Sequence, residues 1–92
     1  MRFEYDPEVD AAYVYLRDLP YAFGEELDHS RHIDYAADKQ PIGIELLYVS
    51  DGVNLDDLPE QEAVARLLQE QQVKVFARSG KAPVLRGRAT DG

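Results

Sequence analysis

The stretch "PIGIELLYV", residues 41–49, constrains the fold more than any other part of the chain. Its apolar residues alternate, as they do along a strand whose successive side chains point to opposite faces. One face would hold Ile42, Ile44, Leu46 and Tyr48. Pro41 must be its first residue or lie on an edge, because proline has no amide hydrogen to donate to a sheet. We predict the strongest β-strand of the chain here.

Three further extended stretches precede this one. "RFEY" (2–5) and "AAYVYLR" (11–17) both alternate, and "DPEVD" between them has the Asp and Pro of a tight turn. The third stretch is "EELDHSRHIDYA" (25–36), which "HS" could interrupt, and the polar turn "ADKQ" follows it. Short connections between four strands predict an antiparallel meander.

The second half of the chain changes character. "DGVNLDDLP" has the composition of a loop, and "PEQEAVARLLQEQQ" (59–72) has the apolar spacing of a helix. Residues 73–77, "VKVFA", could continue this helix or form a fifth strand. The predicted fold class is therefore α+β: a four-stranded antiparallel meander packed by a C-terminal helix, as one domain over residues 1–77.

Charge divides the chain into an acidic body and a basic tail. Residues 1–77 carry 17 Asp and Glu against six Lys and Arg, whereas residues 78–92 carry four Lys and Arg against one Asp. An acidic body disfavours nucleic acid, because it repels phosphate, and suits either a basic protein partner or simple solubility. We expect residues 78–92 to form a flexible tail, which could also act as a basic arm.

The composition of the chain indicates in which cellular compartment we expect the protein. The chain has no cysteine, which excludes disulfides and thiolate sites and is compatible with a reducing compartment. No apolar run approaches the roughly 20 residues that span a bilayer. We expect a soluble cytoplasmic protein without membrane contact.

One face of the expected sheet has no evident cover. Tyr13, Tyr15 and Leu47 would lie on the face opposite to Ala12, Val14 and the other core residues. An uncovered aromatic face of this kind predicts self-association, most simply as a two-fold homodimer.

The acidic start of the chain resembles a metal loop only superficially. Asp6, Glu8 and Asp10 could supply the first calcium ligands, but the template then needs Gly and Glu where Ala11 and Arg17 stand. We expect Asp6 and Asp10 instead to accept backbone N–H bonds across this tight connection.

The two histidines form a weak metal candidate. His29 and His32 are three residues apart, so on a strand they point to opposite faces unless a bulge at Ser30 intervenes. We expect no metal and no cofactor.

Glu45 is the unusual residue of the strongest strand. It shares a face with Gly43 and Leu47, and a covered carboxylate there would need partners. Glu45 could form an acidic cluster with Asp34 and Asp10 for a ligand or for proton transfer. Alternatively, it could make a hydrogen bond that fixes register, or a dimer contact. No serine has a recognisable nucleophile motif, so catalysis is not favoured.

The stretches "YDPEVDAAYVYL" and "HIDYAADKQPIGIELL" resemble the domain-of-unknown-function family numbered 2283, over about residues 3–50. The resemblance rests on Tyr5, Asp6, Pro7, Asp10, Tyr13, Asp34, Tyr35, Gly43, Ile44 and Glu45. Lys39 stands where the hairpin turn usually has Gly, so a differently built turn is expected. The resemblance implies no established enzyme activity. Some members are encoded beside small toxin-like proteins, which implies an antitoxin-like role for those.

Together these observations predict a protein-binding module, homodimeric and antitoxin-like, that binds a small basic protein. The binding residues would be Asp10, Tyr13, Asp34 and Glu45. The alternative is a small hydrolase or metal-dependent enzyme that uses Asp10, Asp34 and Glu45.

Overall fold

A computed structural model describes residues 1–78 of the chain, which fall into two compact units, Met1–Asp51 and Gly52 onward. The first unit holds strands β1 (Arg2–Asp6), β2 (Ala11–Tyr15), β3 (Phe23–Asp28), β4 (Arg31–Tyr35) and β5 (Pro41–Leu47) and the 3₁₀ helix η1 (Val49–Asp51). The second unit holds β6 (Val53–Asn54), α1 (Gln61–Glu70) and β7 (Val75–Phe76). The predicted domain 1–77 spans both units. The predicted basic tail lies, apart from Arg78, outside the described residues.

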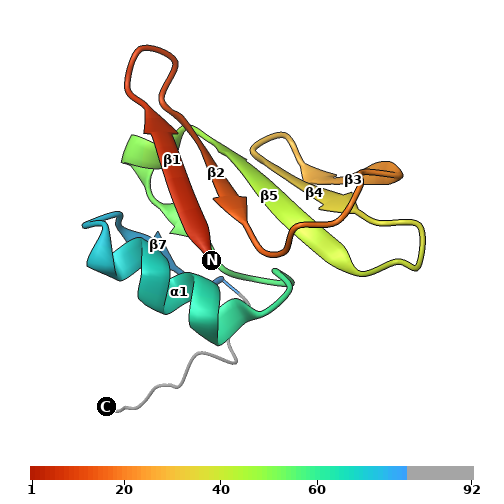
Figure 1. The fold of residues 1–92 in the computed structure, drawn as a ribbon. Helices are drawn as coiled ribbons and strands as arrows, with labels where there is room; N and C mark the ends of the chain where they lie inside the picture. The colour runs from red at the N-terminus through yellow and green to blue at the C-terminus, as the bar shows by residue number, and fades with distance from the viewer. Residues whose placement is uncertain (79–92) are drawn as a thin grey trace. The chain divides into compact units, whose positions relative to one another are not determined.

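The first unit is a five-stranded antiparallel sheet in the order β1-β2-β5-β4-β3 (Figure 1). The α+β class and the antiparallel sheet are confirmed, but the strand count of four was wrong. The third expected strand is two strands, because the chain turns at His29 and Ser30. The order is not a simple meander either. The most apolar strand, β5, takes the central position, where it pairs with both β2 and β4.

One face of this sheet is buried. Its fully buried side chains include Val14, Ile33, Ile44 and Leu46, from the three central strands. The alternation expected for β2 and β5 is confirmed, since Ala12 and Ile42 are also buried. Burying each such aliphatic side chain contributes about 1.5–3 kcal/mol, so this face holds the core of the unit.

Strand β5 is shorter than expected. It ends at Leu47, because Tyr48 has a left-handed backbone (φ 56°) that a strand cannot continue. Tyr48 is 53% exposed and therefore does not join Ile42, Ile44 and Leu46 in the core. Its ring lies against His29 instead, with 5.9 Å between the ring centres.

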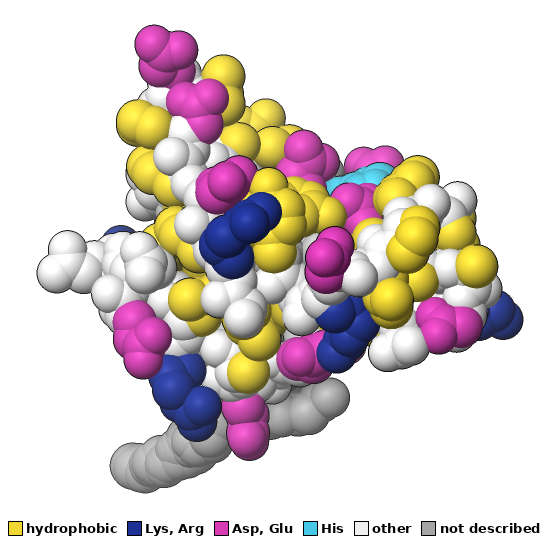
Figure 2. Space-filling view, in the orientation of Figure 1, with side chains coloured by type: hydrophobic (Ala, Val, Ile, Leu, Met, Phe, Trp, Pro, Cys, Tyr) yellow, Lys and Arg dark blue, Asp and Glu magenta, His cyan; other side chains and the backbone are white. Residues whose placement is uncertain are grey.

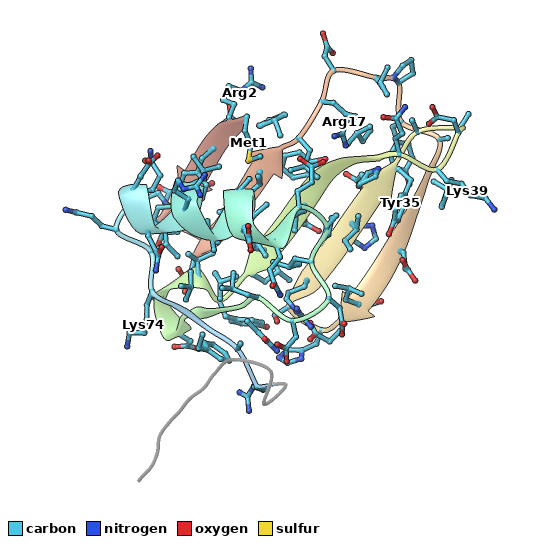
Figure 3. All side chains as sticks on the ribbon, turned by 90° about the horizontal axis from the view of Figure 1, so that it is seen from below. Met1, Arg2, Arg17, Tyr35, Lys39 and Lys74 are labelled. Carbon is cyan, nitrogen blue, oxygen red and sulfur yellow. The ribbon has the colours of Figure 1, made fainter. Side chains whose placement is uncertain are left out.

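The turn between β4 and β5 keeps the geometry that glycine favours. Lys39 has φ 72°, so it adopts the left-handed conformation despite its side chain. The turn is closed by backbone bonds from Lys39 N–H to the Ala36 carbonyl (2.9 Å) and from Ala36 N–H to the Gln40 carbonyl (2.9 Å). Figure 3 shows the Lys39 side chain directed away from the sheet. Lys39 therefore has a backbone conformation that glycine would adopt at lower cost.

The second unit combines one helix with a two-stranded parallel sheet. Helix α1 is shorter than expected, because Glu60 (φ 52°) and Gln72 (φ 64°) have left-handed backbones just outside its ends. Val64 and Leu68 are fully buried on its apolar face. The sequence left open whether residues 73–77 continue the helix or form a strand. Val75 and Phe76 pair with β6, so these two residues form a strand. Within residues 1–78, no helix is long and apolar enough to cross a membrane.

Candidate functional site

The second face of the five-stranded sheet brings most of the polar candidates together. Strand alternation and register place one set of side chains opposite to the core. We call this surface the open face; it comprises Arg2, Glu4, Tyr13, Tyr15, Gly24, Glu26, His32, Asp34, Gly43, Glu45 and Leu47. Three predicted binding residues, Tyr13, Asp34 and Glu45, lie on it, whereas Asp10 does not.

The open face is organised in two rows that cross all five strands. Successive register partners in one row are Glu4, Tyr13, Glu45, His32 and Glu26. In the other row they are Arg2, Tyr15, Gly43, Asp34 and Gly24. Directly opposite side chains in a sheet are about 4.5–5.5 Å apart at Cβ, so neighbours in each row can interact.

Tyr13 and Asp34 are joined across the central strand. The Tyr13 hydroxyl donates to Oδ2 of Asp34 at 2.6 Å. Gly43 makes this approach possible, because a Cβ at that position would lie 1.9 Å from the Tyr13 hydroxyl oxygen. Burial and, after it, the bond to the Asp34 carboxylate raise the pKa of Tyr13 well above its ordinary value. Tyr13 is therefore a hydrogen-bond donor at neutral pH.

His32 contacts the other oxygen of the same carboxylate. Its Nε2 lies 3.4 Å from Oδ1 of Asp34. The ring occupies space over Gly24, where a Cβ would lie 2.4 Å from Nε2. Glu26 and Glu45 are its direct neighbours across β3 and β5. His32 is therefore surrounded by carboxylates from three strands, and Figure 2 shows histidine surface bordered by acidic side chains.

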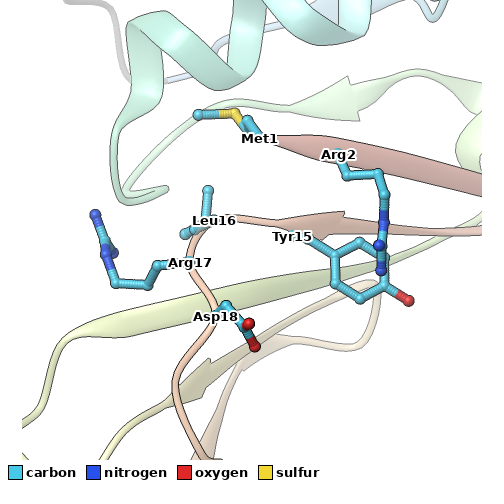
Figure 4. Close-up of a pocket in the computed structure, with 6 residues that line it drawn as sticks. All are labelled: Met1, Arg2, Tyr15, Leu16, Arg17 and Asp18. Carbon is cyan, nitrogen blue, oxygen red and sulfur yellow. The ribbon is translucent and has the colours of Figure 1, made fainter.

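Tyr15 extends the contacts to the edge of the sheet. The Arg2 guanidinium carbon lies 3.9 Å from the centre of the Tyr15 ring (Figure 4). The Tyr15 hydroxyl donates to Oε1 of Glu4 at 2.8 Å, and its ring meets the Tyr13 ring edge-on with 4.7 Å between centres. A continuous set of contacts thus runs from β1 to β4. A guanidinium stacked on an aromatic ring is a favourable cation–π pair.

Glu45 is the exposed carboxylate at the centre of the face. Within residues 1–78 it makes no hydrogen bond or ion pair, so the interpretation that it fixes register through a bond receives no support. It lies at the meeting point of two open hollows, of about 390 Å³ and about 110 Å³. Glu4 and Asp6 also line the first hollow, and Glu26 and Asp28 the second.

Asp10 has a different position and a structural role. It lies in the β1–β2 turn with φ 56°, and its carboxylate accepts hydrogen bonds from the Ser50 hydroxyl (2.7 Å) and backbone N–H (3.0 Å) and from the Tyr5 hydroxyl (2.8 Å). The Ser50 and then the Tyr5 bonds lower its pKa. Asp10 therefore ties the turn to η1. Asp6 accepts the Glu8 N–H at 3.0 Å, as expected for a bond within the turn, whereas the backbone N–H that Asp10 accepts comes from Ser50 and not from the turn.

Two other polar sets do not form a site. A third hollow of about 370 Å³ is lined in part by Arg2 and Arg17, but Figure 4 shows these side chains pointing in different directions. The Arg17 guanidinium donates to the Pro41 carbonyl. In the part of the chain that the structure describes, no three His, Asp or Glu side chains are placed to hold a metal ion.

The chain is thus a small α+β protein whose antiparallel sheet has an acidic, tyrosine-bearing open face. A family model described as a protein of unknown function (DUF2283) matches residues 2–50, and the chain belongs to this family. The match spans all five strands of the sheet, so the open face lies within the family's domain. No curated protein and no solved structure matches the chain.

Proposed function

We propose that the chain is a protein-binding module whose open face binds a small basic protein. The observation that carries this proposal is Glu45, an exposed carboxylate without an ion-pair partner in residues 1–78, where two hollows meet. Both hollows have further carboxylates, and a tyrosine or a histidine lies on either side of Glu45. Such a surface offers charge pairing together with aromatic stacking, which suits arginine.

The charge of the sheet unit supports a basic partner. Residues 1–51 hold twelve Asp and Glu against four Lys and Arg. Complementary charge speeds the encounter of two proteins and suppresses wrong partners. The stacking of Arg2 on Tyr15 is a precedent within the chain for how this face accommodates a guanidinium.

A homodimer remains part of the proposal, but the open face is a poor interface for it. Two copies packed open face to open face would bring Glu4, Glu26 and Glu45 against like charges, which is unfavourable. Strands β1 and β3 are the edges of the sheet and could pair with a second copy instead. Sedimentation velocity on the full chain tests this part independently of partner binding.

We further propose that the protein acts in the cytoplasm in an antitoxin-like role. It rests on the family resemblance, on the acidic sheet and on a sequence without cysteine. The alternative of an enzyme that uses Asp10, Asp34 and Glu45 is less well supported. Asp10 is bound to Ser50 beyond one end of the β2–β5 pair, whereas Asp34 lies beside Gly43 at the other end.

Co-expression with the product of the adjacent gene tests the proposal. The expected result is a complex that Glu45→Lys weakens by about tenfold or more, because a like charge would then face the basic partner. Glu70→Lys is the matched control, since it makes the same charge change at the exposed end of α1. Absence of a complex, or equal weakening by both variants, would contradict the proposal.

A further inference from the structure

We propose that strand β1 is the surface through which two copies of the chain associate, by pairing antiparallel with β1 of a second copy across a two-fold axis. The inference rests on the homodimer that is part of the proposed function and makes it specific. It involves only the edge of the five-stranded sheet and no partner on the open face, so either proposal can fail without the other.

Of the two edge strands of this sheet, β1 is the one without protection against pairing (Figure 1). Strand β3 has three carboxylates and no basic side chain, and its register with β4 shifts between Glu26 and Asp28. Clustered charge and bulges are devices by which proteins keep an edge strand from pairing. Strand β1 pairs with β2 without a register shift, contains no proline and has charges of both signs. A second copy therefore meets an open edge at β1.

The free edge of β1 presents the backbone groups of Phe3 and Tyr5. Leu16 N–H donates to the Ile42 carbonyl at 2.8 Å, so the even-numbered residues of β2 bond to β5 rather than to β1. Phe3 and Tyr5 lie opposite two of these residues, so their N–H and C=O groups point away from β2. Within residues 1–78, no other element's backbone bonds to them. Such a row of unpaired groups is a template for another strand.

One antiparallel register makes the strand complementary to itself. With Phe3 opposite Phe3 of the second copy, Arg2 of each copy faces Glu4 of the other. Met1 then faces Tyr5. Directly opposite side chains share a face and lie about 4.5–5.5 Å apart at Cβ, so both charge pairs are attractive. The neighbouring register, centred on Glu4, sets the two Glu4 carboxylates against each other and is therefore disfavoured.

The side chains of β1 are available for these contacts. Oε1 of Glu4 accepts the Tyr15 hydroxyl at 2.8 Å, whereas Oε2 makes no hydrogen bond within residues 1–78. The Arg2 guanidinium lies over the Tyr15 ring, so it is held at the outermost pair of strands. Arg2, Glu4 and Tyr5 are all exposed. Pairing therefore adds contacts without rearranging the core.

Pairing would also enlarge the binding surface. It joins the two five-stranded sheets into one of ten strands. A two-fold axis perpendicular to the sheet keeps both open faces on the same side. The two copies of Glu45 would then lie five strand spacings apart, which is about 24 Å across the strands. A basic partner with two binding segments could engage both copies at once and gain affinity through avidity.

Amide hydrogen exchange of the full chain at increasing protein concentration tests the inference. Five opposed positions form a small interface, so we expect a dissociation constant in the micromolar range. Between about 10 µM and about 500 µM, protection of the Phe3 and Tyr5 amides should rise severalfold. The Glu4 amide points toward β2 and should not change. Sedimentation velocity over the same range should show monomer converting to dimer.

Charge reversal tests the register. Arg2→Glu and Glu4→Arg, each alone, place like charges opposite each other at both pairs and should raise the dissociation constant about tenfold or more. An equimolar mixture of the two variants should restore association, because the acidic strand of one copy then faces the basic strand of the other. Glu26→Arg makes the same charge change on β3 and should leave the dimer intact.

Several results would overturn the inference. They are a monomer at the highest concentration, exchange of the Phe3 and Tyr5 amides that does not depend on concentration, and a mixture of the two variants that fails to associate. Equal effects of Glu26→Arg and Glu4→Arg would also contradict it, because pairing would then involve β3. No basic partner is present, so these outcomes are separate from failure of the co-expression experiment.

Discussion

The hydroxyl of Tyr13 on β2 donates to the Asp34 carboxylate on β4 at 2.6 Å, although β5 lies between their strands. The bond passes over Gly43, whose missing side chain leaves room for the phenol. It therefore fixes two strands that are not hydrogen-bonded to each other. It also holds the Tyr13 ring over Gly43 on the open face, beside Glu45.

Gly43→Ala should displace Tyr13. The new Cβ would lie 1.9 Å from the phenol oxygen and 2.3 Å from the ring carbon that carries it, so the ring must move and the bond to Asp34 must break. We expect a loss of about 1–3 kcal/mol in the free energy of unfolding, measured with urea. In a Tyr13→Ala background, Gly43→Ala should cost markedly less. An equal cost in both backgrounds would show that the glycine serves another purpose.

The raised pKa of Tyr13 predicts a loss of stability in alkali. Its folded-state pKa exceeds the unfolded value of about 10, so the contribution is complete below pH 10 and is lost as the pH rises toward the folded pKa. Urea unfolding from pH 9 to pH 11.5 should show this decline. Tyr13→Phe should show a smaller decline over the same range, and identical slopes would contradict the assignment.

The lowered pKa of Asp28 predicts that stability depends on pH with the opposite sign, and is lost in acid. Its carboxylate accepts hydrogen bonds from Nε and Nη2 of Arg31, at 3.1 and 2.9 Å. These bonds lower the pKa of Asp28 to about 2. The stabilisation is present above the unfolded pKa of about 3.9 and is lost as the pH falls toward 2. Asp28→Asn should therefore flatten the fall in stability between pH 4 and pH 2. A variant with an unchanged acid profile would refute this pairing.

Lys39→Gly should stabilise the chain. Lys39 holds φ 72°, which costs a residue with a Cβ about 1 kcal/mol or more, and its side chain points into solvent. We expect a gain of roughly 1 kcal/mol in unfolding free energy from the urea midpoint, less the added backbone entropy of glycine. Lys39→Ala keeps the Cβ and should show no comparable gain. A gain of similar size in both variants would mean that the backbone is not the cause.

The sequence predicted the faces of β2 and β5 well, because alternation reports directly which side chains share a face. It also predicted three of the four candidate binding residues, Tyr13, Asp34 and Glu45, to be close together. It did not predict the central position of β5 or the fifth strand, because strand order depends on pairing between distant segments. The contacts of His32 and Tyr15 were not predicted for the same reason, since their neighbours follow from the register.

Asp10 shows what local patterns do not reveal. Its acidic neighbours suggested a cluster, but its carboxylate binds Ser50, forty residues further along the chain. No local spacing encodes that contact. Lys39 is a related case, because lysine rarely adopts a left-handed backbone, and only the glycine that the family's turn usually has at this position pointed to one.

The central claim is that the open face binds a basic protein, and an amide chemical-shift map of the complex with the adjacent gene's product tests it most directly. The account predicts the largest shifts at Tyr13, His32 and Glu45, with small changes in α1. Largest shifts in α1 or in the 3₁₀ helix η1, with the signals of these three residues unmoved, would contradict it.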